Sequence, residues 1–134
     1  MNICEKLKDI RPEGNVVCDI FNGRQVISRK ERLKKYNYYN LPSELWLDIS
    51  IDEAQQILEN SFCFHLESER EILEKELVTP LIKGFLNALP KDAKIMTNYD
   101  GSFEPISNAF LDIAVIAELD GVVGIICIEE KQES

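Results

Sequence analysis

Hydrophobic residues recur every three or four positions in three segments, and this is the spacing of an amphipathic helix. The first segment covers residues 2–10. The second runs to about Asn60 behind Ser50-Ile51-Asp52-Glu53, a capping box in which serine and glutamate satisfy each other's backbone amides. The third opens with a second capping box at residues 68–71. We expect Pro80, which has no amide proton, to kink or restart this helix, whose predicted buried stripe is Leu73, Leu77 and Leu81.

Apolar runs bounded by turn residues predict strands over residues 16–21, 24–28, 45–49, 93–99, 110–119 and 122–130. Asn22-Gly23 joins the first two runs and Asp120-Gly121 joins the last two, and both dipeptides favour two-residue hairpin turns. Ile125, Ile126 and Ile128 leave the last strand almost no polar face, which is typical of a central strand covered by helices. The pattern therefore predicts a single α+β domain (1–134): a largely antiparallel sheet with two hairpins and two or three helices packed on it.

Residues 29–40 are basic and then aromatic, and we interpret them as an exposed strand end and a loop. Six cations lie between Arg24 and Lys35, and three tyrosines follow: Tyr36, Tyr38 and Tyr39. Such a stretch can follow a phosphate backbone and stack bases, so a nucleic-acid-binding module is one alternative function. The other interpretation is internal, with the basic segment lying against the acidic helices.

Charge is distributed unevenly along the chain. The 134 residues carry 15 basic and 24 acidic side chains, for a formal net charge of −9. Residues 1–40 hold nine basic against five acidic residues, whereas residues 41–134 hold six against 19. A field this negative repels nucleic acid at long range and attracts basic proteins. We therefore expect a basic protein as the partner.

The residues that commonly carry catalysis do not form a recognisable set. His65 lies between Phe64 and Leu66, without a nucleophile motif, and we interpret it as a structural residue. Four separated cysteines show no metal-ligand spacing, and we interpret them as small buried hydrophobic residues. No glycine-rich phosphate loop occurs. These observations predict a protein that is not an enzyme and holds no cofactor and no metal.

One pattern indicates a different chemistry. Asp112 lies in the first strand of the last predicted hairpin, and Glu129-Glu130-Lys131 closes the second strand. An acid, a hairpin and then Glu-x-Lys resembles the PD-(D/E)xK nuclease superfamily, although Leu111 stands before Asp112 where that motif has proline. The resemblance implies that Asp112 and Glu129 would hold a divalent metal, with Lys131 helping to position the attacking water. A metal-dependent nuclease is thus the second alternative function.

Acidic residues predict the partner surface. On the helix expected after Ser68, Glu67, Glu71 and Glu74 share one outward face, and Asp52 and Glu53 extend it if the two helices pack side by side. Tyrosine and tryptophan dominate interface hot spots, so the candidate anchors are Tyr38, Tyr39 and Trp46, with the core as the other place for Trp46. For any single acidic residue, the alternative role is a solvated face that aids solubility.

A small, acidic α+β domain without a catalytic set resembles the immunity proteins of bacterial toxin–immunity pairs, including contact-dependent growth inhibition systems. The resemblance is one of overall character, and no motif carries it. It implies a protein that neutralises a basic toxin domain, often a nuclease, by placing carboxylates in its substrate cleft. The partner would be the carboxyl-terminal domain of a secreted bacterial protein. An acidic regulatory adaptor is a further alternative function. Because no signal peptide or membrane-spanning run is evident, we expect a cytoplasmic protein without a membrane partner.

Overall fold

The computed structural model describes residues 2–22, 29–39, 41–42, 45–119 and 121–132. Its helices are α1 (Ile3–Ile10), α2 (Arg29–Lys35), α3 (Ile51–Cys63) and α4 (Lys75–Asn87). Its strands are β1 (Asn15–Asn22), β2 (Leu47–Ile49), β3 (Lys94–Thr97), β4 (Leu111–Leu119) and β5 (Val122–Glu130). No helix in these ranges is long and apolar enough to cross a membrane.

The strands form one sheet in the order β1-β5-β4-β3-β2, and every pairing between the described strands is antiparallel. The last predicted hairpin is confirmed by its register, in which Leu119 pairs with Val122 and Gly121 takes a positive φ of 83°. As predicted, β5 is an inner strand, flanked by β1 and β4. The α+β fold predicted from the sequence is therefore the fold of the protein.

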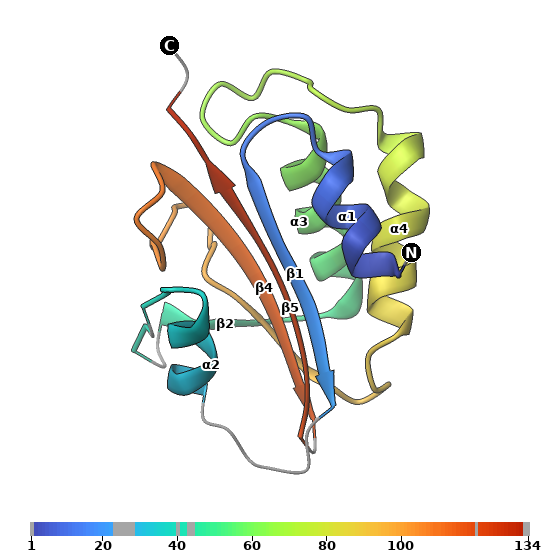
Figure 1. Cartoon of the computed structure of the whole chain (residues 1–134), viewed down its shortest axis with the longest axis vertical. Coiled ribbons are helices and arrows are strands. Elements are labelled where there is room, and N and C mark those ends of the chain that lie inside the picture. The colour runs from blue at the N-terminus through green and yellow to red at the C-terminus, as the bar shows by residue number, and fades with distance from the viewer. Residues whose placement is uncertain (1, 23–28, 40, 43–44, 120, 133–134) are drawn as a thin grey trace.

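Three helices cover one face of the sheet, as Figure 1 shows: α1, α3 and α4 lie together on one side, and α2 lies on the other. The larger core fills the space under α1, α3 and α4 and includes Leu7, Phe62, Ile82 and Phe85, all with no exposed surface. Pro80 lies inside α4, which runs through it as one helix without restarting. All four cysteines are buried free thiols, as the sequence predicts.

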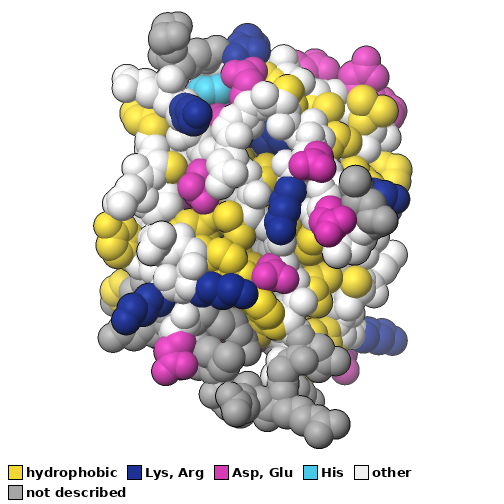
Figure 2. All heavy atoms as spheres, in the orientation of Figure 1, with side chains coloured by type: hydrophobic (Ala, Val, Ile, Leu, Met, Phe, Trp, Pro, Cys, Tyr) yellow, Lys and Arg dark blue, Asp and Glu magenta, His cyan; other side chains and the backbone are white. Residues whose placement is uncertain are grey.

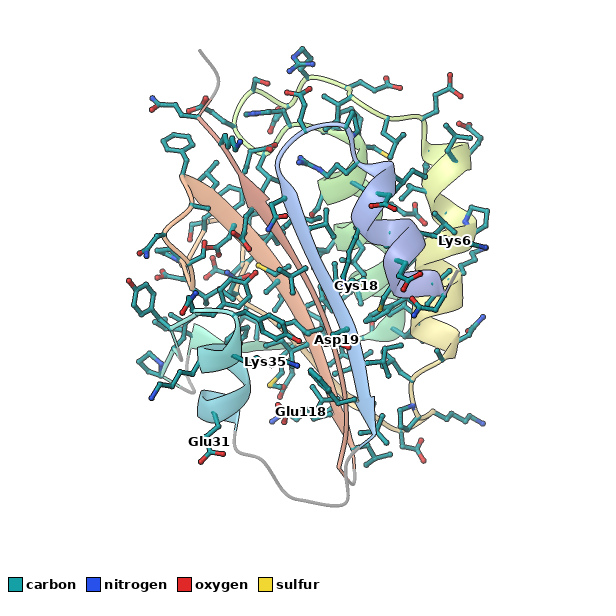
Figure 3. The ribbon with its side chains drawn as sticks, viewed as in Figure 1. Lys6, Cys18, Asp19, Glu31, Lys35 and Glu118 are labelled. Carbon is teal, nitrogen blue, oxygen red and sulfur yellow. The ribbon has the colours of Figure 1, made fainter. Side chains whose placement is uncertain are left out.

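The second face of the sheet is covered by residues that we predicted to be an exposed strand end and a loop. Arg29–Lys35 forms α2, and Leu33 is 1% exposed against β4 and β5 residues. Lys35 on α2 lies 3.9 Å from Asp19 on β1 and 4.4 Å from the Phe21 ring centre (Figure 3). Residues 29–35 are therefore a helix and not the predicted strand end, whereas residues 36–39 follow it without regular structure, as predicted. The predicted contact with the acidic helices is wrong, because α2 lies on the opposite face of the sheet, where two-sided burial of β4 and β5 requires cover. The predicted strand over residues 24–28 and its turn at Gly23 lie outside the described residues.

The two predicted capping boxes have different outcomes. Ser50 caps α3: its side chain accepts from the Glu53 amide at 3.1 Å, and Glu53 accepts from the Ser50 amide at 3.0 Å. Ser68 caps no helix, because α4 begins only at Lys75. The predicted helix start is therefore wrong. So is the predicted buried stripe, because Leu77 is 55% exposed and the fully buried residues of α4 are Val78, Ile82, Phe85 and Leu86.

Candidate functional site

The predicted acidic face is divided in the structure. Glu67, Glu71 and Glu74 are exposed, but they lie in the loop before α4 and not on one side of a helix. Asp52 and Glu53 are exposed in the first turn of α3. That turn is about 20 Å along α3 from the end that meets the loop. Although α3 and α4 pack together, these five carboxylates do not form one surface.

Two of the three predicted aromatic anchors lie in the core. Tyr38 and Trp46 are each 6% exposed and pack on the α2 face of the sheet. The Tyr38 hydroxyl donates to the Glu129 carboxylate, and burial is the main cause that raises the pKa of Tyr38 far above its ordinary value. Tyr39 is 56% exposed. Of the three, Tyr39 alone presents its ring to solvent.

Asp112 holds a loop in place. It has no exposed surface, and its carboxylate accepts from Asn98 Nδ2 at 2.8 Å, from the Ile106 amide and from the Ser107 amide and hydroxyl. The Asn98 side chain in turn accepts from the Ala114 amide at 2.7 Å. These bonds tie the segment between β3 and β4 to the sheet. Both carboxylate oxygens of Asp112 are occupied by protein donors.

Of the arrangement that the nuclease resemblance implies, the structure shows only the pairing of Asp112 with Glu129 across neighbouring strands. Asp112 and Glu129 are direct cross-strand partners, whereas Lys131 is exposed just beyond the end of β5. Glu129 accepts from the Tyr38 hydroxyl and, at 3.4 Å, from Asn15 Nδ2. In the part of the chain that the structure describes, no three His, Cys, Asp or Glu side chains are placed to hold a metal ion.

The loop between α3 and α4 is organised by His65. The imidazole Nδ1 accepts from the amides of Glu67 and Ser68 at 3.2 and 3.3 Å, which makes this nitrogen an acceptor. The His65 amide donates to the Arg70 carbonyl, and the Glu69 amide donates to the His65 carbonyl, both at 2.9 Å. This tight turn holds Glu69 at a φ of 59°, a left-handed conformation that costs energy for any residue with a Cβ. The structural interpretation of His65 therefore has a concrete basis. We call residues 64–74 the acidic loop.

A buried ion pair anchors the acidic loop to the sheet. The Arg11 guanidinium binds both carboxylate oxygens of Glu130, at 2.7 and 2.9 Å, and both residues are nearly solvent-free. Arg11 also donates to the carbonyls of Ser61 and Phe64, and Glu130 accepts from the Leu66 amide at 3.0 Å. Burial raises the pKa of Glu130, but the hydrogen bonds from Arg11 and Leu66 and the Arg11 charge outweigh it. The net effect is a lowered pKa.

A cavity of about 390 Å³ opens beside the acidic loop, and we call it the aromatic pocket. Its walls include Ile57, Phe64, Tyr99 and Phe103, and Glu69 lies on its lining. The Tyr99 and Phe103 rings are 4.9 Å apart between centres and tilted by 42°. Phe64, which bridges to Glu71 across the acidic loop, is 37% exposed. The pocket thus combines exposed aromatic surface with a carboxylate.

A second, smaller cavity of about 220 Å³ lies on the other side of Phe64, and its lining includes Glu59, Glu71 and Glu76. Lys75 Nζ lies 3.2 Å from the Glu59 carboxylate. Burial raises the pKa of Glu59, but hydrogen bonds from Gln55 and Lys75 lower it by more, so the net shift of the pKa is downward. Figure 2 shows acidic side chains gathered at the upper right, over the acidic loop and the start of α4. Phe64 therefore stands between two cavities in an acidic neighbourhood.

No sequence signal marks Phe64, Tyr99, Phe103 or Glu69 as a site residue. From the sequence, Phe64 is only a neighbour of His65, and Tyr99 only the end of a predicted strand. No sequence motif links residue 64 with residues 99 and 103, which meet because β3 lies beside β4 and α3 packs over both strands. Comparison with protein-family models, with curated proteins and with solved structures finds no match to the chain.

Proposed function

We propose that this protein binds a basic protein domain through the acidic loop and the Phe64 cavities, and that it is an immunity protein that neutralises a toxin in this way. The observation that carries the proposal is the position of Phe64: an exposed aromatic ring between two cavities, close to several carboxylates. Those exposed on the loop and on the first turn of α4 are Glu67, Glu69, Glu71, Glu74 and Glu76.

The two components of this surface serve different steps of binding. Exposed carboxylates attract a basic partner from a distance and raise the association rate, an effect that salt screens. An aromatic ring that becomes desolvated in the complex slows dissociation. If the toxin domain is a nuclease, its cleft is basic because it binds phosphates, and the loop carboxylates would take the place of those phosphates. This is the mode of action that the resemblance to immunity proteins implies.

We expect the reading frame directly upstream of this gene to encode a large secreted protein with a basic carboxyl-terminal domain, and the test uses that domain. We expect a complex whose association rate falls steeply as salt rises. The variant Glu67→Lys/Glu71→Lys/Glu76→Lys should associate at least roughly tenfold more slowly at low salt. Phe64→Ala should instead dissociate faster.

A charge-matched control separates the surface from net charge alone. Asp48, Asp52 and Asp92 are exposed and lie away from the acidic loop, before or at the start of α3 and after α4. Reversing these three to lysine changes net charge by the same amount and should slow association much less. Equal slowing in both triple variants, or no complex with the upstream domain, would contradict the proposal. So would metal-dependent DNA or RNA cleavage that is lost in Glu129→Ala.

A further inference from the structure

The aromatic pocket is large enough to hold one long side chain. Its volume of about 390 Å³ lies at the small end of the range of ligand sites, roughly 300–1,000 Å³. Ile57 and Phe64 form apolar wall, and the tilted pair Tyr99 and Phe103 supplies ring surface. The segment that carries both rings is held to β4 by the buried Asp112. A pocket with walls held in this way needs little reorganisation to bind.

Glu69 is an unusual residue for its backbone conformation. A φ of 59° favours glycine, because a Cβ atom then lies close to the following carbonyl oxygen, and asparagine is tolerated because its short polar side chain can hydrogen-bond locally. The chain nevertheless places a glutamate here, on the pocket lining. Strain at such a position is commonly kept where the side chain has a function. Glu69 therefore adds an acidic residue to the lining of the aromatic pocket.

We propose that the aromatic pocket binds an arginine side chain of the basic partner, with the guanidinium against the Tyr99 and Phe103 rings and paired with Glu69. The inference rests on the proposed function, because a basic domain supplies the arginine. It adds the chemical identity of the group that enters the pocket.

Charge complementarity and ring chemistry favour arginine over the other occupants. The planar guanidinium stacks on aromatic rings and donates two parallel hydrogen bonds to one carboxylate, while its methylene stem covers apolar wall. A lysine ammonium is a compact, strongly hydrated charge that cannot form the two-pronged bond. A leucine or phenylalanine side chain would leave the Glu69 carboxylate facing an apolar group and partly desolvated.

The experiment titrates the isotope-labelled protein with N-acetyl-L-arginine methylamide and follows amide and aromatic resonances by NMR. We expect saturable shifts at Phe64, Tyr99 and Phe103, with weak affinity in the millimolar range. The lysine and norleucine analogues should bind at least roughly fivefold more weakly. Shifts that do not saturate, or equal affinity for all three analogues, would overturn the inference.

Two variants of one residue separate binding from folding. Glu69→Gln keeps the shape of the side chain and should weaken the binding of the arginine analogue at least roughly fivefold. Glu69→Gly relieves the backbone strain, so its melting temperature should equal or exceed that of the wild type while analogue binding falls. Glu71→Gln is the matched control, since Glu71 is exposed on the same loop but lines the other cavity. Unchanged binding in both Glu69 variants would refute the assignment.

The two proposals fail in different ways. If the analogue does not bind but the basic domain does, in a salt-dependent manner that needs the acidic loop, the arginine pocket is refuted and the proposed function stands. If the analogue binds as expected and the upstream domain does not, the pocket stands and the proposed partner is wrong.

Discussion

At the scale of single residues, Arg11 and Glu130 form a buried ion pair with two hydrogen bonds. Removing two charges from water costs several kcal/mol per ion, and only close geometry with additional hydrogen bonds compensates for it. Here the guanidinium makes two bonds to the carboxylate and also binds the carbonyls of Ser61 and Phe64. The pair therefore joins the end of β5, the end of α3 and the start of the acidic loop.

We predict that Glu130→Gln lowers the free energy of unfolding by about 3–5 kcal/mol, because it leaves the Arg11 charge buried without a counter-charge. Glu13→Gln is the control. Its partner Arg70 lies at 2.9 Å, but both side chains are substantially exposed, so the loss should stay below about 1 kcal/mol. Urea denaturation measures both variants. Similar losses in the two would contradict the distinction.

The lowered pKa of Glu130 also predicts a dependence on pH. The contribution of a carboxyl with a lowered folded-state pKa is complete above its unfolded value, about 4.3 for glutamate, and is lost as pH falls through the folded-state pKa. The difference in unfolding free energy between wild type and Glu130→Gln should therefore shrink as pH falls below about 4. Denaturant titrations at several acidic pH values measure it. A constant difference down to the lowest pH at which the fold persists would contradict this assignment.

At the scale of elements, two identical local signals have different fates. Ser50 and Ser68 are each followed three residues later by glutamate, but only Ser50 begins a helix. Around Ser68, the His65 imidazole accepts hydrogen bonds from the backbone amides of Glu67 and Ser68, and Phe64 forms an antiparallel β-bridge with Glu71. The loop is thus held by other partners, and α4 starts only when these contacts end.

We predict that Ser50→Ala lowers the free energy of unfolding by about 1 kcal/mol, the usual cost of losing a helix cap. Ser68→Ala should change it by less than about 0.5 kcal/mol, because the bond that the Ser68 hydroxyl accepts from the exposed Arg70 amide is long, at 3.3 Å. Thermal and urea unfolding of both variants make the comparison. If Ser68→Ala costs as much as Ser50→Ala, the acidic loop depends on Ser68 more than its contacts indicate.

At the scale of the whole molecule, the sheet carries a core on each face. The larger core lies under α1, α3 and α4, and the smaller one under α2 includes Leu33, Tyr38 and Trp46. Inner strands β4 and β5 contribute to both, with six consecutive buried residues in each strand. A chain of this size with two-sided burial has what it needs to fold as one cooperative unit, although its four cysteines are free thiols.

We predict a single unfolding transition whose midpoint is unchanged by chelator or by reductant. All four cysteines are free and buried, and burial raises the pKa of the Cys63 and Cys127 thiols, which keeps them protonated and unreactive at neutral pH. Calorimetry with EDTA or with a phosphine reductant measures this. A fall in the midpoint of several degrees with either reagent would contradict it.

Local sequence patterns determined much of the fold. The spacing of Ile3, Leu7 and Ile10, the capping box at Ser50 and the apolar runs around Asp120-Gly121 each specify an element through contacts within a few residues, so they can be recognised without tertiary information. Composition likewise specified the acidity of the molecule. Two-sided burial of the last strand was also evident, although the segment that covers its second face was not.

The tertiary structure alone decided the start of α4, the burial of Tyr38 and Trp46, and the site beside Phe64. Each depends on partners far away in sequence: Arg11 and Glu130 are 119 residues apart, and Arg11 and Ser61 are 50 apart. At Ser68 the capping signal does not start a helix, because His65 and Phe64 make other contacts within the acidic loop and Arg11 and Glu130 bind that loop from afar. The basic segment likewise became a cover for the sheet. Whether a polar or aromatic residue is exposed depends on what packs over it, and packing is a property of the whole chain.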